Sequence, residues 1–349
     1  MRILIATDAW HPQVNGVVRT LTMMVEAAKG LGVDVSFLTP ASFRTFALPS
    51  YADLRVALPG RGKIARLIAA ASPDNIHIAT EGPIGFAVRA YCRRRDIPFT
   101  TSFHTRFPEY ISARFPIPES WIWAGLRRFH GASSAVMAAT PALASELRDR
   151  GFGHVALWPR GVDAKLFHPR QVALGMPKPI FLCVGRVAVE KNLEAFLSLD
   201  LPGTKVVVGD GPARAALQLK YPKAVFLGAL QGEALAVAYA ASDVFVFPSR
   251  TDTFGLVLLE ALASGVPVAA FPVAGPRDVI GQAPVGVLSE DLREACLGAL
   301  KLSSQDCLRF AASLTWEACA RTFISNISLV RAELHDGAKS AIHKPPVAA

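Results

Sequence analysis

The sequence has few cysteines, and their spacing gives them no structural role as a group. Only five occur among 349 residues, and no two of them form a Cys-x-x-Cys pair. They are Cys92, Cys183, Cys296, Cys307 and Cys319. An odd number at such spacings argues against a disulfide framework or a structural zinc site, and is typical of a reduced, cytosolic chain.

Long apolar runs without a break are also missing. The longest one, residues 254–271, is interrupted by Glu260, Gly265 and Pro267, so we expect a buried helix followed by a strand there in place of a membrane span. The opening stretch MRILIAT ends at Asp8 and is too short for a signal sequence. Both features predict a cytoplasmic location.

Apolar character is abundant, because 51% of the residues are hydrophobic and 19% are charged. Such a composition can bury large cores and excludes disorder for all but the ends of the chain. A chain of 349 residues also exceeds the size at which one hydrophobic core keeps growing. We therefore expect two domains.

Short β-rich runs alternate with amphipathic stretches of helical length along the whole chain. This order indicates βαβ units and predicts an α/β fold with two doubly wound parallel sheets. The expected strands are residues 2–7, 34–38, 75–80, 99–102, 135–138, 155–158, 180–186, 205–211, 224–227, 244–247 and 266–271. The expected helices include residues 20–31, 84–95 and 141–150.

The alternation pauses at HPRQVALGMPKP, residues 168–179, where three prolines and a glycine leave no clear period. The pause predicts a first domain over residues 1–168 and a second over residues 169–314. Residues 315–335 have helical periodicity and are expected to cross back to the first domain. The tail, residues 336–349, is expected to be flexible.

The positive charge is unevenly distributed. Residues 1–170 hold 21 Lys and Arg against 12 Asp and Glu, whereas residues 171–349 hold 16 of each kind. Such an asymmetry favours a polyanionic partner for the first domain, either an anionic membrane surface or nucleic acid. The alternative is an ordinary solvated basic surface.

Ligands bind at the carboxyl ends of strands in sheets of this kind, and three loops of the first half carry candidate residues there. In HPQVNGVVRTL, Asn15 and Gly16 allow a tight turn that exposes backbone N–H groups. In TSFHTRFPEY, His104 follows a strand, and in TEGPIG so does Glu81. The alternatives are plain loops and a surface histidine.

Cations follow the first strand of the second half, in CVGRVAVEKNLEAF. Arg186 and Lys191 can converge on one point, an arrangement that suits a diphosphate through charge-assisted hydrogen bonds. A surface arginine paired with Glu190 is the alternative. The next strand ends in GDGPAR, which lacks the third glycine of a dinucleotide-binding motif. We therefore expect Gly211 to lie in a tight turn that makes some contact with a nucleotide, without a full dinucleotide site.

The segment TDTFGLVLLEALASG, residues 251–265, places two acids around a glycine. Asp252 precedes Gly255, whose neighbours leave backbone N–H groups open at a helix start, and Glu260 lies inside that helix. The alternatives are a capping role for Asp252 and a satisfied core acid at Glu260. A buried Glu260 needs hydroxyl or cationic partners, which sugar and ribose hydroxyls can supply.

Together these motifs resemble the retaining glycosyltransferases of family 4. The resemblance covers nearly the whole chain, through NGVVRTL, RGVDAKLF, GRVAVEK, GDGP and TDTFGLVLLEALASGVPV. It implies the GT-B fold, in which two Rossmann-like domains face each other across a cleft. The bound donor would be a nucleotide-diphosphate sugar.

The resemblance also implies roles for the second-half residues. Arg186 and Lys191 match the basic pair that holds the diphosphate, and Glu260 matches the acid that binds the donor ribose. Asp252 stands where the sugar-facing acid is usually glutamate. The backbone at Phe254, Gly255 and Leu256 would face the phosphate or the sugar.

In the first half, His104 matches the active-site histidine near the transferred sugar, and Gly16 matches the loop at the donor phosphate and acceptor. Glu81 and Asn15 are expected near the acceptor or the sugar. No second carboxylate is evident for a double displacement, so the resemblance favours front-face attack. No cofactor is expected, and no metal, because TDT contains a single acid.

The TDTFG form is similar to that of lipid-directed members, including sulfoquinovosyl- and glucuronosyl-diacylglycerol synthases. This likeness implies transfer of a glucosyl or glucuronosyl unit, from a donor that is expected to be UDP-linked, to a lipid such as diacylglycerol. The basic domain would dock on the anionic inner face of the cell membrane, without nucleic acid. Alternatives are a GDP-mannose-dependent α-mannosyltransferase, a nucleotide-sugar 2-epimerase and a non-catalytic peripheral membrane protein.

Overall fold

The computed structural model describes residues 1–13, 15–48, 51–104, 117–252 and 254–328. The chain divides into two compact units. The first comprises Met1–Pro159 together with the segment that begins at Cys319, and the second comprises Arg160–Ala318. Each unit is built on its own sheet.

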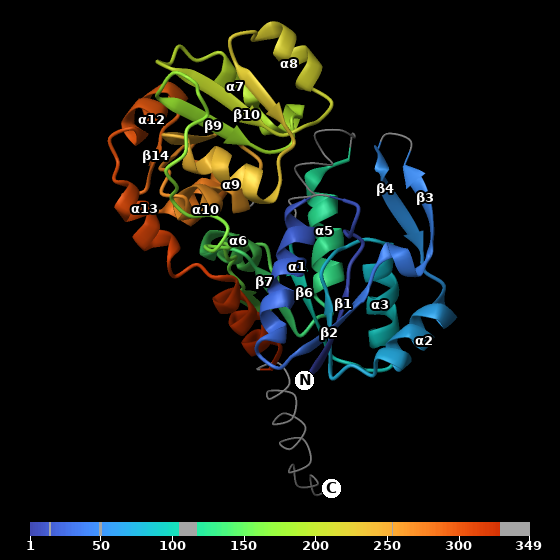
Figure 1. Cartoon of the computed structure of the whole chain (residues 1–349). Coiled ribbons are helices and arrows are strands. Elements are labelled where there is room, and N and C mark those ends of the chain that lie inside the picture. Colours follow the sequence, from blue (N-terminus) through green and yellow to red (C-terminus); the bar gives the residue numbers. More distant parts are fainter. Residues whose placement is uncertain (14, 49–50, 105–116, 253, 329–349) are drawn as a thin grey trace, which may run out of the picture. The chain divides into compact units, whose positions relative to one another are not determined.

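The described part of the first unit contains a parallel sheet with the strand order β2-β1-β5-β6-β7-β8 (Figure 1). Its strands are β1 (Arg2–Ala6), β2 (Asp34–Leu38), β5 (Asn75–Ile78), β6 (Phe99–Phe103), β7 (Ala135–Ala138) and β8 (Val155–Leu157). Its helices are α1 (Gly16–Lys29), α2 (Arg61–Ala71), α3 (Pro83–Arg93), α5 (Glu119–His130) and α6 (Pro141–Asp149). A short 3-10 turn, η1 (Pro40–Ser42), follows β2.

A two-stranded antiparallel hairpin, β3 (Arg44–Leu48) and β4 (Tyr51–Leu58), pairs outside this sheet. No strand was predicted there. Two of its large apolar side chains, Phe46 and Leu58, are exposed, so the apolar residues give no clear strand signal there. The α/β alternation of the first half is therefore interrupted by one antiparallel insertion.

The second unit also holds a parallel sheet among its described residues, with the order β11-β10-β9-β12-β13-β14. Its strands are β9 (Ile180–Val184), β10 (Thr204–Val208), β11 (Val225–Gly228), β12 (Val244–Phe247), β13 (Val268–Ala270) and β14 (Gly286–Leu288). Its helices are η2 (Val189–Lys191), α7 (Leu193–Leu197), α8 (Arg214–Lys220), α9 (Gly232–Ala240), α10 (Leu256–Ala263), α11 (Ala274–Ile280), α12 (Leu292–Ala299) and α13 (Ser304–Ala311).

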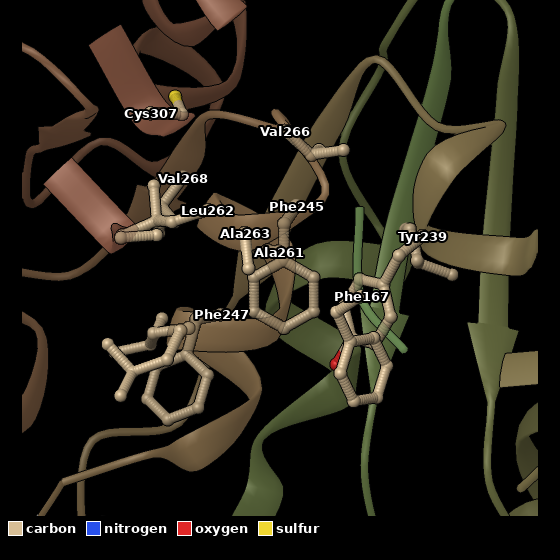
Figure 2. Close-up of a cluster of buried hydrophobic side chains, with 14 of the residues drawn as sticks. Phe167, Tyr239, Phe245, Phe247, Ala261, Leu262, Ala263, Val266, Val268 and Cys307 are labelled. Atoms are coloured by element: carbon tan, nitrogen blue, oxygen red, sulfur yellow. The ribbon is translucent and has the colours of Figure 1, made fainter. Parts of the chain in front are cut away.

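Helices cover both faces of this second sheet, as expected for a doubly wound fold. Alternate residues of each strand point to opposite faces. Leu182 packs in the cluster that includes α9, α10 and α13, whereas Phe181 packs with α7 and α12. Figure 2 shows the first cluster, where the rings of Phe167 and Tyr239 lie 5.6 Å apart between centroids. Both strand faces are therefore apolar, which explains the nearly continuous hydrophobic runs in the sequence.

The division between the units falls at residue 159/160, earlier than the predicted 168/169. The physical reason is that Val162 and Phe167 are buried in the second core, and Val162 N donates to Leu314 O at 2.8 Å. Residues 316–328 are helical, and Phe323 packs on Trp158 of the first unit. Residues 329–335 and the expected flexible tail, residues 336–349, lie outside the described part.

Candidate functional site

The strand order of the second sheet reverses between β9 and β12, which are neighbours. In open α/β sheets, ligands bind outside the carboxyl ends of the strands at such a switch point. Here the loop that leaves β9 carries Arg186 and Lys191, and the loop that leaves β12 carries Asp252. The predicted donor-site residues of the second half therefore flank the position that the topology favours.

Lys191 and Asp252 form an ion pair across these two loops. The Lys191 Nζ lies 2.6 Å from Asp252 Oδ1, and the two side chains are 30% and 24% exposed. Asn192, in the left-handed region at φ 53°, donates from Nδ2 to Pro248 O at 3.1 Å and so joins the same loops. Lys191 is the last residue of the 3-10 turn η2, and the next helix, α7, begins two residues later at Leu193.

The second carboxylate oxygen of Asp252 is buried and has no hydrogen-bond partner among the described residues. A buried acceptor without a donor costs about 1–3 kcal/mol, so a ligand hydroxyl or N–H placed there would be favourable. Nearby, burial raises the pKa of the Cys183 thiol to about 12, while the charges of Lys191 and Asp252 act on it in opposite directions. The thiol is therefore neutral near pH 7.

Helix α10 starts at this site, at the end of the loop that carries Asp252. Its N-cap is Gly255 at φ 83°, and no side chain caps it, so a capping role for Asp252 is not observed. An added Cβ at Gly255 would lie 3.1 Å from the ring of Phe247. Phe254 and Leu256 flank this glycine and are half-buried. The first N–H groups of a helix lack internal acceptors and carry partial positive charge, which favours an anion.

Glu260 lies inside α10 and is 2% exposed. Its Oε2 accepts a hydrogen bond from the Tyr239 hydroxyl at 2.9 Å. The hydroxyl partner that the buried acid needs is thus supplied, in part, by the protein itself. Sequence reasoning did not identify Tyr239, and the ribose role of Glu260 stays a prediction.

The glycines after β9 and β10 allow two loops to pack backbone against backbone. At Gly211, with φ 156°, an added Cβ would lie 2.4 Å from Val187 O. Val187 N donates to Asp210 O at 2.9 Å. Gly211 therefore shapes the loop that carries the exposed Arg186, while its contact with a nucleotide stays a prediction.

The first sheet has its own switch point between β1 and β5, and a partly buried acid, Asp8, lies there. Asp8 accepts hydrogen bonds from Ile84 N at 2.9 Å and from Gly85 N at 3.2 Å, at the start of α3. Thr80 Oγ1 donates to the same carboxylate. Burial raises the pKa of Asp8, and the backbone hydrogen bonds oppose this shift. Sequence reasoning missed this residue, although an acid directly after the first strand was a usable signal.

Glu81 contacts a buried histidine. Its Oε1 lies 3.0 Å from His130 Nε2, and its side chain is 6% exposed. The other ring nitrogen of His130 is 2.9 Å from Thr101 Oγ1. His130 was not among the predicted residues, because a histidine at the end of a helix gives no distinctive signal. The structure gives Glu81 a protein partner, and its acceptor role stays a prediction.

His104 directly follows β6 and contacts Ser102 of that strand. Its Nε2 lies 2.9 Å from Ser102 Oγ, which also lies 3.0 Å from His77 Nε2. The His77 Nδ1 is 2.8 Å from Thr100 Oγ1. A serine hydroxyl carries one proton, so Ser102 donates to at most one of the two imidazoles, and at least one of them donates its Nε2–H to Ser102. The tautomers of His77 and His104 are therefore coupled.

Asn15 is the N-cap of α1, and Gly16 is its first residue. The Asn15 Oδ1 accepts from Val17 N and Val18 N, both at 3.0 Å. No atom lies within 4 Å of a Cβ added at Gly16. The cap explains the NG pair structurally, and the open space beside Gly16 is compatible with the predicted approach of a ligand.

Two sequence families match the chain, one in each half. The profile described as Glycosyltransferase Family 4 matches residues 14–166, and that of the group 1 glycosyl transferases matches residues 178–303. A GDP-mannose-dependent alpha-mannosyltransferase of Mycobacterium tuberculosis is 32% identical over 82% of this chain and 83% of its own length. The chain belongs to glycosyltransferase family 4. This membership favours glycosyl transfer over epimerisation and over a non-catalytic role.

Other relatives of this glycosyltransferase act on different molecules, as their names state. The sulfoquinovosyl transferase SQD2 of Arabidopsis thaliana is 36% identical over 68% of the chain. The chain spans about half the length of that relative, since the match covers 50% of it. An alpha-monoglucosyldiacylglycerol synthase of Streptococcus pneumoniae is 26% identical over 86% of the chain and 78% of its own length.

Solved structures show that this glycosyltransferase has the GT-B fold. A sucrose-phosphate synthase from Thermosynechococcus elongatus superposes with a TM-score of 0.75 at 19% identity, over 97% of this chain and 99% of the other. The Anabaena protein HepE in complex with UDP gives a TM-score of 0.69 at 17% identity, over 94% and 100%. At these identities the likeness establishes the fold alone.

Two features are absent from the described part of the glycosyltransferase. None of its described helices is both long enough and apolar enough to cross a bilayer. No group of three or more His, Cys, Asp or Glu side chains among these residues could hold a metal ion. Metal independence stays a prediction.

Proposed function

We propose that the protein transfers a hexosyl unit, glucosyl or glucuronosyl, from a UDP-linked sugar to a membrane lipid such as diacylglycerol. The observation that carries the proposal is the Lys191–Asp252 pair at the switch point of the second sheet, beside the N-terminus of α10. A cation, a helix N-terminus and a buried carboxylate oxygen at one place suit a diphosphate joined to a polyhydroxylated group.

The diphosphate would lie against Lys191, Arg186 and the first N–H groups of α10. These groups would stabilise the negative charge that grows on the leaving diphosphate, which is a large source of rate enhancement in enzymes. The unpartnered oxygen of Asp252 would accept a hydrogen bond from a sugar hydroxyl. A uridine donor is compatible with this architecture, because the crystal structure of HepE, which has the same fold, contains UDP.

We propose front-face transfer with retention at the anomeric carbon. The bond between that carbon and the phosphate oxygen breaks, and the acceptor oxygen bonds to the same face. The acceptor proton passes to the departing diphosphate oxygen. Lys191 has three N–H donors, so it can hold Asp252 and the diphosphate together.

The acceptor proposal is supported by charge and by relatives. The excess of Lys and Arg lies entirely in residues 1–170. Each basic residue close to an anionic bilayer contributes about 1 kcal/mol of attraction. The relatives include a glucosyldiacylglycerol synthase and a sulfoquinovosyl transferase. We therefore place the protein peripherally on the cytoplasmic face of the cell membrane.

A second candidate function is α-mannosyl transfer from GDP-mannose. The mycobacterial mannosyltransferase aligns over 82% of this chain and 83% of its own length, more than the plant relative does. The same diphosphate contacts would serve either donor. The two candidates differ in nucleotide base and in sugar, and a product assay separates them.

The test is to incubate the protein with diacylglycerol vesicles and, separately, UDP-glucose, UDP-glucuronate, UDP-galactose and GDP-mannose, and to identify lipid products by mass. A hexosyl- or hexuronosyl-diacylglycerol formed from a UDP-sugar supports the first function. A mannolipid formed from GDP-mannose alone supports the second. No glycolipid with any donor would refute the proposed acceptor. A parallel reaction with chelator tests metal independence.

A further inference from the structure

A basic groove lies in the first unit, away from the strand ends that carry the candidate site. It has a volume of about 760 Å³ and lies where α3 and α5 end. Pro98 and Phe99 line it at the start of β6, and Ser134 lines it just before β7. These residues mark the amino ends of the strands, whereas Asp8, Glu81 and His104 lie beyond the carboxyl ends.

Four arginines line this groove: Arg89, Arg93, Arg127 and Arg128. Arg89 is fixed, because its Nε donates to Phe129 O at 2.7 Å and its Nη2 donates to Arg128 O at 2.5 Å. These bonds join α3 to the last turn of α5. Arg93, Arg127 and Arg128 line the same groove and are exposed, and Arg127 Nη1 lies 3.5 Å from Arg150 O.

The positive charges of Arg89, Arg93 and Arg128 lie close enough to act on one another. Burial lowers the pKa of Arg89, and the charges of Arg93 and Arg128 lower it further. In the described part of the chain, no carboxylate forms an ion pair with Arg93, Arg127 or Arg128. The acid that lines the groove is Asp96, which is exposed. Like charges held together in this way repel one another until an anion neutralises them.

We propose that this arginine groove binds a phosphate monoester dianion. Arginine presents a planar fork of N–H donors that matches phosphate oxygens in pairs. The volume admits a phosphate with an attached glycerol or sugar, which suits either a lipid headgroup or a free phosphate ester. Within the first unit the groove lies at the amino ends of the strands, whereas Glu81 and His104 lie beyond the carboxyl ends, so its ligand would be distinct from the acceptor proposed there.

The experiment has two arms, run on the full chain. In the first, inorganic phosphate is titrated into the protein by calorimetry. In the second, the protein is sedimented with phosphatidylcholine vesicles that contain phosphatidic acid, and with vesicles of phosphatidylcholine alone. Binding in the first arm identifies free phosphate as sufficient, whereas binding in the second arm alone identifies a lipid headgroup.

The variants are the Arg93→Gln/Arg128→Gln double substitution and, as a matched control, Arg94→Gln. Arg94 is exposed in the same basic run but does not line the groove. We expect the double variant to bind at least about tenfold more weakly, because two of the guanidinium groups that would pair with the phosphate oxygens are lost. The control should bind as the parent protein does.

Two results would overturn the proposal: no binding in either arm, or an equal loss in the double variant and the Arg94→Gln control. Equal losses would mean that the general basic surface, not the groove, attracts the anion. Binding of UDP and GDP should be the same in all variants. Failure of the groove is thereby distinguished from failure of the proposed transferase function.

Discussion

At the residue scale, Asp252 has two different oxygens. One contacts Lys191 at 2.6 Å, and the other is buried without a partner among the described residues. The first oxygen positions the cation that we assign to the diphosphate. The second oxygen is placed to accept a hydrogen bond from a hydroxyl group of the donor sugar.

The Asp252→Glu substitution tests this assignment. Glutamate is longer by about 1.5 Å, the length of one carbon–carbon bond. The substitution would therefore move the carboxylate oxygen that accepts the hydrogen bond from the sugar. We expect the ratio of kcat/KM values between two donor sugars to change, while the affinity for the free nucleotide diphosphate stays nearly the same. An equal loss of both quantities would show that Asp252 acts mainly through the loop structure.

Ser102 is predicted to be a positioning residue that acts through His104. In Ser102→Ala the hydroxyl that joins His77 to His104 is lost, so the tautomer and orientation of His104 are no longer fixed. We expect kcat to fall about tenfold, which is less than the roughly 10²–10⁴-fold that a general acid–base group itself contributes, with KM little changed and a shifted pH profile. Ser102→Thr keeps the hydroxyl and should restore most of the activity. A loss in both variants with an unshifted profile would indicate a packing role.

Asp8 predicts a pH dependence of stability. Because burial raises its pKa in the folded state, its protonated form is favoured there, and its contribution is greatest below its unfolded pKa of about 3.9. The free energy of unfolding relative to Asp8→Asn should therefore fall as the pH rises above about 4. Urea unfolding of both proteins across this range measures the difference. A difference that grows with pH would contradict the assigned direction.

The residue-scale contacts show what the sequence could not reveal. Arg186, Lys191 and Asp252 lie in loops that follow β9 and β12, and the sequence alone could place them after these strands. The pairing of Lys191 with Asp252 depends on the adjacency of β9 and β12, which no local pattern encodes. The Tyr239 hydroxyl beside Glu260 likewise depends on the packing of α9 against α10.

At the element scale, the start of α10 depends on a left-handed residue. In Gly255→Ala, the strained φ costs about 1–2 kcal/mol, and the new methyl group also meets the Phe247 ring. We expect a loss of stability of about that size and weaker nucleotide diphosphate binding, measured by calorimetric unfolding and titration.

Gly16→Ala is the matched control for this glycine. It lies at the start of α1, with open space around the added Cβ. Alanine is the better helix former by about 1 kcal/mol, so this variant should be as stable as the parent or slightly more stable. Equal destabilisation by both substitutions would contradict the role given to the backbone at Gly255.

Most parallel strands could be predicted to within two or three residues, because buried apolar runs between turn residues give a strong local signal. The β3–β4 hairpin could not be predicted, since its large apolar side chains Phe46 and Leu58 are exposed and give no clear buried pattern. The 3-10 turn at Lys191 was also missed, because a single turn before a short helix has no distinct period.

At the scale of the whole molecule, composition and alternation predicted the two-sheet architecture, and the motifs together predicted the family. The unit boundary was misplaced because the proline-rich segment is a turn inside the second unit, whereas Phe167 before it is already buried in that core. Charge asymmetry is a property of the whole chain, but the arginine groove arises from helix ends that the sequence does not bring together.

The central claim is that the second unit holds a nucleotide diphosphate at Lys191. Calorimetric titration of UDP and GDP into the full chain tests it most directly, with Lys191→Met and, as control, Lys220→Met, whose exposed lysine pairs with Glu194. We expect binding of at least one nucleotide, weakened at least about tenfold in Lys191→Met and unchanged in the control. No binding to the parent protein, or equal binding to both variants, would contradict it.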